Sequence, residues 1–314
     1  MVLALCFAAL VAITGCTPAE QPQNERISVV CTIFPPYDWV CQILGEQAAA
    51  LDLTLLINNR NDLHNYQPSV DDMIKIATCD LLIYVGGESD RWVEDALKNT
   101  VNQKRVALNL MNLLGSAVKP EETFADPAAV AKADPTETDE HVWLSLNNAR
   151  LFCPVIAAAL EALTPEYAGV YRANLALYLE KLAGLDLAYR EAVAVAPVKC
   201  LLFGDRFPFR YLTDDYGLTA YAAFPGCSAE TEASFATVLS LAQKTDELRL
   251  KRILVTESAD QALARTIISN TNEQNQQILV MDAMQATTLK DFQNGATYLS
   301  VMEYNLEILK EALE

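Results

Sequence analysis

The chain contains only two histidines, and each belongs to a short motif rich in polar and aromatic residues. His64 begins the run His-Asn-Tyr-Gln-Pro, and His141 lies within Asp-Glu-His-Val-Trp-Leu. A neutral imidazole ring suits a borderline transition metal at neutral pH. Either histidine alone is more simply a packed or a surface residue. The hypothesis of a metal site therefore rests on the two motifs together.

Carboxylates follow several of the runs that look like strands. Asp205 comes directly after the apolar run 201–204, Glu257 ends the run 253–256, and Asp282 ends the run 278–281. Ligands of parallel α/β sheets bind beyond the carboxyl ends of the strands. Two imidazoles from the first half of the chain could thus face carboxylates from the second half across a cleft. Each acid taken singly fits a helix cap or a surface charge equally well.

The elements that would position these side chains alternate along the chain. Apolar, β-branched runs alternate with helical patterns, which predicts parallel sheets with right-handed crossovers. The first half has expected strands at 27–33, 51–57, 81–85 and 105–110, and helices at 37–44, 69–77 and 91–99. The second half has strands at 198–203, 219–224, 252–256 and 277–281, and helices at 209–216, 232–241, 259–270 and 298–313.

One long helical segment separates the two halves. Thr164 can cap it, Pro165 suits its first position, and Pro197 ends it. About 30 residues at 1.5 Å each make a strut of roughly 45 Å. The predicted fold class is therefore α/β, with two small parallel-sheet α/β domains joined by one long rigid helix and a cleft between them. The expected boundaries are 27–163 (with an acidic loop at 115–140), 164–196 for the linker helix, and 197–314.

The N-terminus predicts export. Val2 to Ile13 form an apolar run that is too short to span a bilayer, and Cys16 follows a glycine ahead of a polar tract. This resembles a lipoprotein signal peptide, with residues 1–26 as signal and tether and Cys16 as the lipidated residue. No Lys or Arg precedes the run, which leaves a start further upstream as an open alternative. No later stretch looks apolar enough to cross a membrane.

Charge and cysteines narrow the function further. A formal net charge of -18 argues against nucleic acid as a partner and suits a soluble protein that handles cations. Six cysteines remain after Cys6 and Cys16, without a Cys-x-x-Cys pair. The pairings Cys31–Cys79 and Cys200–Cys227 are the disulfides to check first, and buried free thiols are an equal alternative.

Taken together, these motifs resemble the zinc- and manganese-binding solute-binding lipoproteins of ABC importers (cluster A-I, the adhesin-like metal receptors). The resemblance covers nearly the whole chain after the N-terminal segment. It is carried by residues 30–39, 64–68, 139–145, 211–218, Asp282 and 298–306. It implies two α/β domains joined by a rigid helix, with the metal bound between them.

The resemblance also implies a ligand set. His64, His141 and Asp282 match three ligand positions of the family. At the fourth position the chain has Arg206, which cannot bind a cation. Asp205 is the expected replacement, and Glu257, Glu230 or water are the alternatives.

The implied role is capture of a divalent metal and its delivery to an ABC permease with a cytoplasmic ATPase. Zn2+ is favoured and Mn2+ remains the alternative. We expect a monomer, lipid-anchored to the outer face of the bacterial cell membrane, and not an enzyme. An exported metal-dependent hydrolase and a surface adhesin are the competing interpretations of the same ligands.

Overall fold

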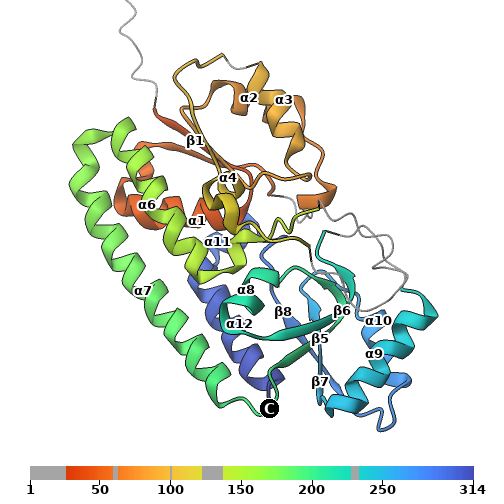
Figure 1. Cartoon of the computed structure of the whole chain (residues 1–314). Helices are drawn as coiled ribbons and strands as arrows, with labels where there is room; N and C mark the ends of the chain where they lie inside the picture. The colour runs from red at the N-terminus through yellow and green to blue at the C-terminus, as the bar shows by residue number, and fades with distance from the viewer. Residues whose placement is uncertain (1–25, 59–62, 100, 122–136, 228–232) are drawn as a thin grey trace, which may run out of the picture.

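The computed structural model describes residues 26–58, 63–99, 101–121, 137–227 and 233–314 (Figure 1). The proposed signal peptide with Cys16, most of the acidic loop and Glu230 lie outside the described residues.

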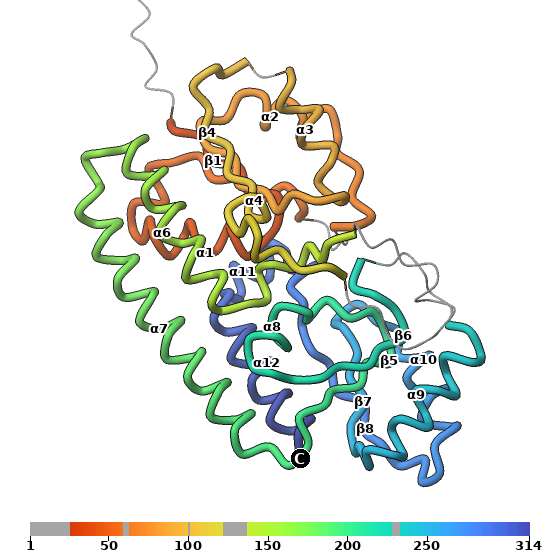
Figure 2. The backbone as a smooth tube through the Cα atoms, viewed as in Figure 1, coloured from red at the N-terminus to blue at the C-terminus, as the bar shows by residue number. Residues whose placement is uncertain are grey.

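Each half of the chain forms a four-stranded parallel sheet (Figure 1), and the course of the backbone through the two halves can be followed in Figure 2. The first sheet has the order β2-β1-β3-β4, with β1 at Ser28–Cys31, β2 at Asp52–Leu55, β3 at Leu81–Tyr84 and β4 at Val106–Asn109. The second has the order β6-β5-β7-β8, with β5 at Cys200–Phe207, β6 at Thr219–Pro225, β7 at Arg252–Thr256 and β8 at Gln277–Met281. All described pairings within the two sheets are parallel. The predicted fold class and all eight predicted strands are confirmed.

Helices connect the strands. They are α1 (Phe34–Leu44), α2 (Val70–Thr78), α3 (Arg91–Lys98), α4 (Leu110–Leu114), α6 (Leu146–Leu163), α7 (Ala168–Val195), α8 (Arg210–Tyr216), α9 (Phe235–Leu248), α10 (Ala262–Ser269), α11 (Leu289–Gln293) and α12 (Tyr298–Ala312). Helix α1 begins three residues earlier than expected because Pro35 and Pro36 occupy its first turn, where proline costs no hydrogen bond. The short helices α4 and α11 were not predicted.

The linker is the continuous helix α7, which runs along both halves (Figure 1). Its 28 residues span about 42 Å. A 3-10 turn, Pro165–Tyr167, precedes it. The expected cap at Thr164 is wrong, because its hydroxyl donates to the Leu160 carbonyl and pairs with the Tyr171 hydroxyl instead.

The hydrophobic core crosses the boundary between the halves. One cluster of buried side chains contains Val29 of β1, Phe203 of β5 and Met281 of β8. Tyr298 of α12 donates from its backbone N–H to Asp38 Oδ2 (2.9 Å) and from its hydroxyl to the Trp143 carbonyl (2.7 Å). Separating the halves would expose this apolar surface to water, which opposes wide hinge opening.

Two expectations from the sequence need correction. The first was that no stretch after the N-terminal run is apolar enough to cross a membrane, but helix α6, Leu146–Leu163, is long and apolar enough by length and composition. It nevertheless packs in the core through Phe152, Ile156 and Leu160. The two suggested disulfides are also wrong, because all six cysteines among the described residues are free thiols.

Candidate metal centre

The two histidines meet at the carboxyl ends of the sheets. His64 lies in the 3-10 turn Leu63–Asn65 beyond β2, and His141 lies just before the turn Val142–Leu144. Their Nε2 atoms are 3.1 Å apart, although the residues are 77 positions apart in the chain. The side chain of His141 is fully buried, and that of His64 is 7% exposed. The fold therefore turns two remote motifs into one pair of facing nitrogen donors.

Other side chains hold the opposite edge of each ring. His141 Nδ1 lies 3.0 Å from Asp139 Oδ1, which also accepts from the His141 backbone N–H. His64 Nδ1 lies 2.6 Å from the hydroxyl of Ser89. With the Nδ1–H of His141 donating a hydrogen bond to Asp139, the Nε2 atom of the neutral ring presents a lone pair toward His64. A carboxylate behind a metal-binding imidazole is the usual way to orient it.

Uncompensated carboxylate oxygens surround the pair. Glu140 Oε1 accepts from the backbone N–H groups of Glu88 and Ser89, and its Oε2 lies 3.9 Å from His64 Nδ1. Oε2 of Glu140 and Oδ2 of Asp139 are buried without a hydrogen-bond partner among the described residues. Burial raises the pKa of Glu140 above its usual value. Buried acceptors of this kind favour a nearby positive charge.

Two further side chains reach the histidine pair from the second half. Gln285 Nε2 lies 2.6 Å from His141 Nε2 and 3.4 Å from His64 Nε2. A ligand atom from each of His64, His141 and Cys227 lies within 4.8 Å of the other two. Burial, followed by the negative charges of Asp139, Glu121 and Glu140, raises the pKa of the Cys227 thiol well above its usual value.

A glycine makes room for the approach of Cys227. Residue Gly226 follows β6 directly, and a Cβ atom there would lie 2.9 Å from Cε1 of His141 and 2.8 Å from the Phe207 carbonyl oxygen. The backbone therefore passes close to the Cε1 and Nδ1 atoms of the imidazole. The Cys227 N–H donates to Glu121 Oε1 (2.7 Å), which fixes the chain at this point.

A strained loop carries Gln285. Glu257 accepts from the backbone N–H groups of Ala283 (2.8 Å) and Gln285 (3.1 Å), and Asp282 accepts from that of Met284 (2.7 Å). Met284 has a φ of 58°, a left-handed conformation that is costly for this residue type. The Trp143 indole packs on His141 and donates to the Ala283 carbonyl (2.9 Å). The loop is thus tied to the histidine pair from both halves.

The predicted carboxylate ligands have other partners in this structure. Asp205 Oδ2 accepts from the backbone N–H (3.2 Å) and the hydroxyl of Thr256. Glu257 and Asp282 hold the loop just described. Burial and then the charge of Asp282 raise the pKa of Glu257 to about 7, and burial raises the pKa of Asp282. Neither aspartate belongs to the described group of His64, His141 and Cys227.

Sequence analysis missed the contributions of Gln285, Cys227, Ser89 and Asp139. Gln285 stands four residues after β8, and Cys227 two residues after β6. The rule that ligands bind at strand ends would have included both. Only acidic side chains were predicted as ligands at the strand ends, so Gln285 was not among them. Cys227 was predicted only as a possible disulfide partner or a buried free thiol.

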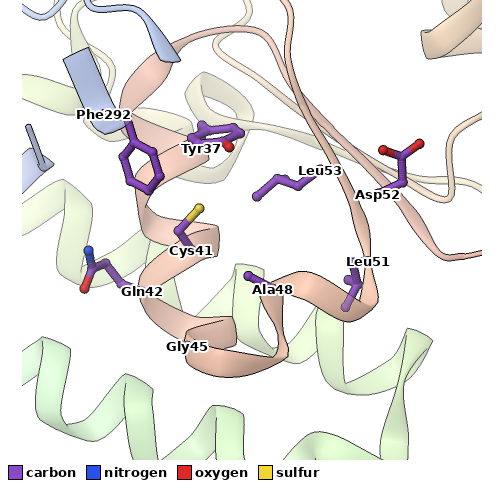
Figure 3. A pocket seen from close by; sticks show the side chains of 9 residues that line it. All are labelled: Tyr37, Cys41, Gln42, Gly45, Ala48, Leu51, Asp52, Leu53 and Phe292. Atoms are coloured by element: carbon purple, nitrogen blue, oxygen red, sulfur yellow. The ribbon is translucent and has the colours of Figure 1, made fainter. Parts of the chain in front are cut away.

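A separate surface pocket, of about 520 Å³, is lined by residues of the first half and by one residue of the second half. Tyr37 and Cys41 of α1, Leu53 of β2 and Phe292 of α11 line it (Figure 3). None of its lining residues belongs to the histidine cluster.

Comparison with known proteins identifies the family. The family model "Zinc-uptake complex component A periplasmic" matches residues 29–312. The chain belongs to this family. It is 31% identical to the zinc-binding lipoprotein AdcA of Streptococcus pneumoniae over 99% of its own length, and it spans 61% of that relative. It is 27% identical to the high-affinity zinc uptake system protein ZnuA of Bacillus subtilis, covering 99% of the chain and 96% of the relative.

Solved structures share the fold. The Zn(II)-bound ZnuA-like domain of Streptococcus pneumoniae AdcA matches with a TM-score of 0.71 at 28% identity, over 92% of this chain and 99% of that one. The metal-dependent lipoprotein YcdH of Bacillus subtilis matches with a TM-score of 0.74 at 26% identity, over 92% of this chain and all of that one. The family resemblance inferred from the two histidine motifs is confirmed.

Proposed function

We propose that this protein captures zinc outside the cell membrane and delivers it to an ABC permease driven by a cytoplasmic ATPase. The observation that carries the proposal is the convergence of His64 Nε2 and His141 Nε2 to 3.1 Å at the facing ends of two parallel sheets. Orphaned carboxylate oxygens behind the rings favour a cation there. The zinc-binding relatives support the choice of ion.

The ion is cargo, so the site must bind it without a reaction. Two neutral imidazoles suit zinc, whereas manganese prefers oxygen-rich sites. The core that continues through both halves opposes wide opening. Release is therefore expected to involve the loops that carry His64, Cys227 and Gln285, with little movement of the sheets.

Titration calorimetry, with a competing chelator if binding is tight, tests the proposal. His64→Ala and His141→Ala should each weaken zinc binding at least a hundredfold, because each removes one of the two facing nitrogens. Asn65→Ala, an exposed neighbour of His64, is the matched control and should bind as the wild type does. Unchanged zinc affinity in both histidine variants would refute capture at this site.

The assignment of Asp205 and Asp282 as ligands remains a sequence-based prediction. To reach an ion, either carboxylate would have to leave the partners described above. Asp205→Ala and Asp282→Ala should therefore each cost less zinc affinity than the histidine variants. A loss as large as that of His141→Ala would identify a carboxylate ligand.

Anchoring and delivery form the cellular part of the proposal. Cys16 would carry the lipid that holds the protein, as a monomer, at the outer face of the membrane. Labelling with a fatty acid in cells should be lost in Cys16→Ala, and the protein should then leave the membrane fraction. Deletion of the gene should slow growth in zinc-depleted medium, with rescue by added zinc. No observation supports the hydrolase alternative.

A further inference from the structure

A third metal donor stands beside the histidine pair. Cys227 is the one cysteine that the structure brings to both histidines within the described residues, with the three ligand atoms mutually within 4.8 Å. In a tetrahedral zinc site with Zn–N of about 2.0–2.1 Å and Zn–S of about 2.3 Å, neighbouring ligand atoms are about 3.4–3.6 Å apart. The two Nε2 atoms, 3.1 Å apart, are slightly closer than this, so a small separation of the rings and an approach of the sulfur would bring the cluster to that geometry.

The backbone at Gly226 and Cys227 is held close to His141. Gly226 removes the side chain that would collide with His141, and Glu121 fixes the Cys227 backbone N–H. Gln285, which is 7% exposed, approaches the same two imidazoles from another strand end. Four side chains from four separate loops thus converge on one point.

We propose that Cys227 binds the captured ion as a thiolate, together with His64 and His141, and that this sulfur ligand makes the site selective for zinc over manganese. On binding, the Cys227 S–H bond breaks, the sulfur lone pair coordinates the ion and the proton is released to solvent. Thiolates favour zinc, whereas manganese prefers carboxylate and water oxygens. The inference deepens the proposed function and rests on it.

Cobalt(II) is the probe, because it replaces zinc in tetrahedral sites and its spectrum reports sulfur. A Co–thiolate bond gives an intense near-ultraviolet charge-transfer band, and the visible d–d bands report binding whether or not sulfur is a ligand. Wild-type protein with one equivalent of Co2+ should show both. Cys227→Ser should keep the d–d bands and lose the charge-transfer band. Cys41→Ser, which alters a partly exposed free thiol in α1, is the matched control and should keep both.

Competition titrations add a second measurement. Cys227→Ser should weaken zinc binding at least tenfold and change manganese binding less than threefold, so that the zinc-to-manganese affinity ratio falls by more than threefold. Thermal unfolding of the metal-free variants verifies that the substitution leaves the fold intact.

The outcomes separate this inference from the proposed function. The role of Cys227 would be overturned if the wild type showed d–d bands without a charge-transfer band, or if the charge-transfer band survived in Cys227→Ser. Either result would leave capture by the histidines standing. Wild-type protein that binds neither Co2+ nor Zn2+ would overturn both.

Discussion

Asp139 should control metal affinity without touching the metal. Its Oδ1 accepts from both the backbone N–H (2.8 Å) and Nδ1 (3.0 Å) of His141. Asp139→Asn keeps an oxygen that can accept both bonds and removes the negative charge. The substitution therefore isolates the electrostatic contribution of the carboxylate behind the ring.

The distance sets the size of the effect. With a Zn–N bond of about 2 Å, the ion would lie roughly 7 Å from Asp139 Oδ1 across the imidazole ring. Coulomb's law for a divalent ion at that distance gives about 1 kcal/mol in bulk water and about 5 kcal/mol at an effective dielectric constant of 20. Substitutions behind metal-binding histidines typically cost 10–100-fold in affinity, about 1.4–2.8 kcal/mol, which lies between these limits. We expect a 10–100-fold weaker zinc affinity.

A chelator competition titration at constant pH and salt measures this change. Asp215→Asn is the matched control, because Asp215 is a carboxylate that accepts from Ser145 (2.6 Å) and lies outside the metal cluster. Unfolding of the metal-free proteins must be measured in parallel. The amide N–H₂ of the variant takes the position of Asp139 Oδ2, which lacks a described partner, so any change in folding stability must be separated from the change in zinc affinity. Zinc affinity within threefold of the wild type would refute the electrostatic argument.

Two further predictions concern stability and packing. Burial raises the pKa of Asp38 from 3.8 to about 6, so the folded state loses up to about 3 kcal/mol as pH rises through that interval. Asp38→Asn mimics the protonated acid, so its urea midpoint should change less between pH 4 and pH 7 than that of the wild type. An identical change of the urea midpoint with pH in both proteins would contradict this. Gly226→Ala should displace the His141 ring and weaken zinc binding at least tenfold, whereas Gly169→Ala, where a Cβ meets nothing within 4 Å, should bind normally. Equal affinities would argue against close packing on His141.

The architecture could be predicted from the sequence because its signals are local. Buried β-branched runs such as Leu81–Tyr84 predict strands wherever they lie, and alternation with helices predicts parallel sheets. The cap at the start of α7 was predicted wrongly. Thr164 has the residue type of a cap, but its hydroxyl forms bonds to Leu160 and Tyr171 in the packed structure.

The same division holds for the metal centre. His64 and His141 were identifiable because they are rare and belong to motifs, and a pairing 77 residues apart requires only that the fold join them. The positions of Cys227 and Gln285 beside the histidines could not be predicted, because both residues have ordinary neighbours in the chain. Strand-end acids such as Asp205 and Asp282 looked equally suitable until their hydrogen-bond partners were known.

By itself, then, the sequence determined the two parallel sheets, the stiff helix between them and the two imidazoles, because residue type and periodicity encode them directly, and its motifs carried the resemblance to the family. Tertiary structure alone decided which other donors face those imidazoles. Side-chain direction at a strand end depends on loop conformation, as at Gly226 and Met284, and on contacts from distant elements such as Trp143. Those contacts exist only once the two halves have packed on one core.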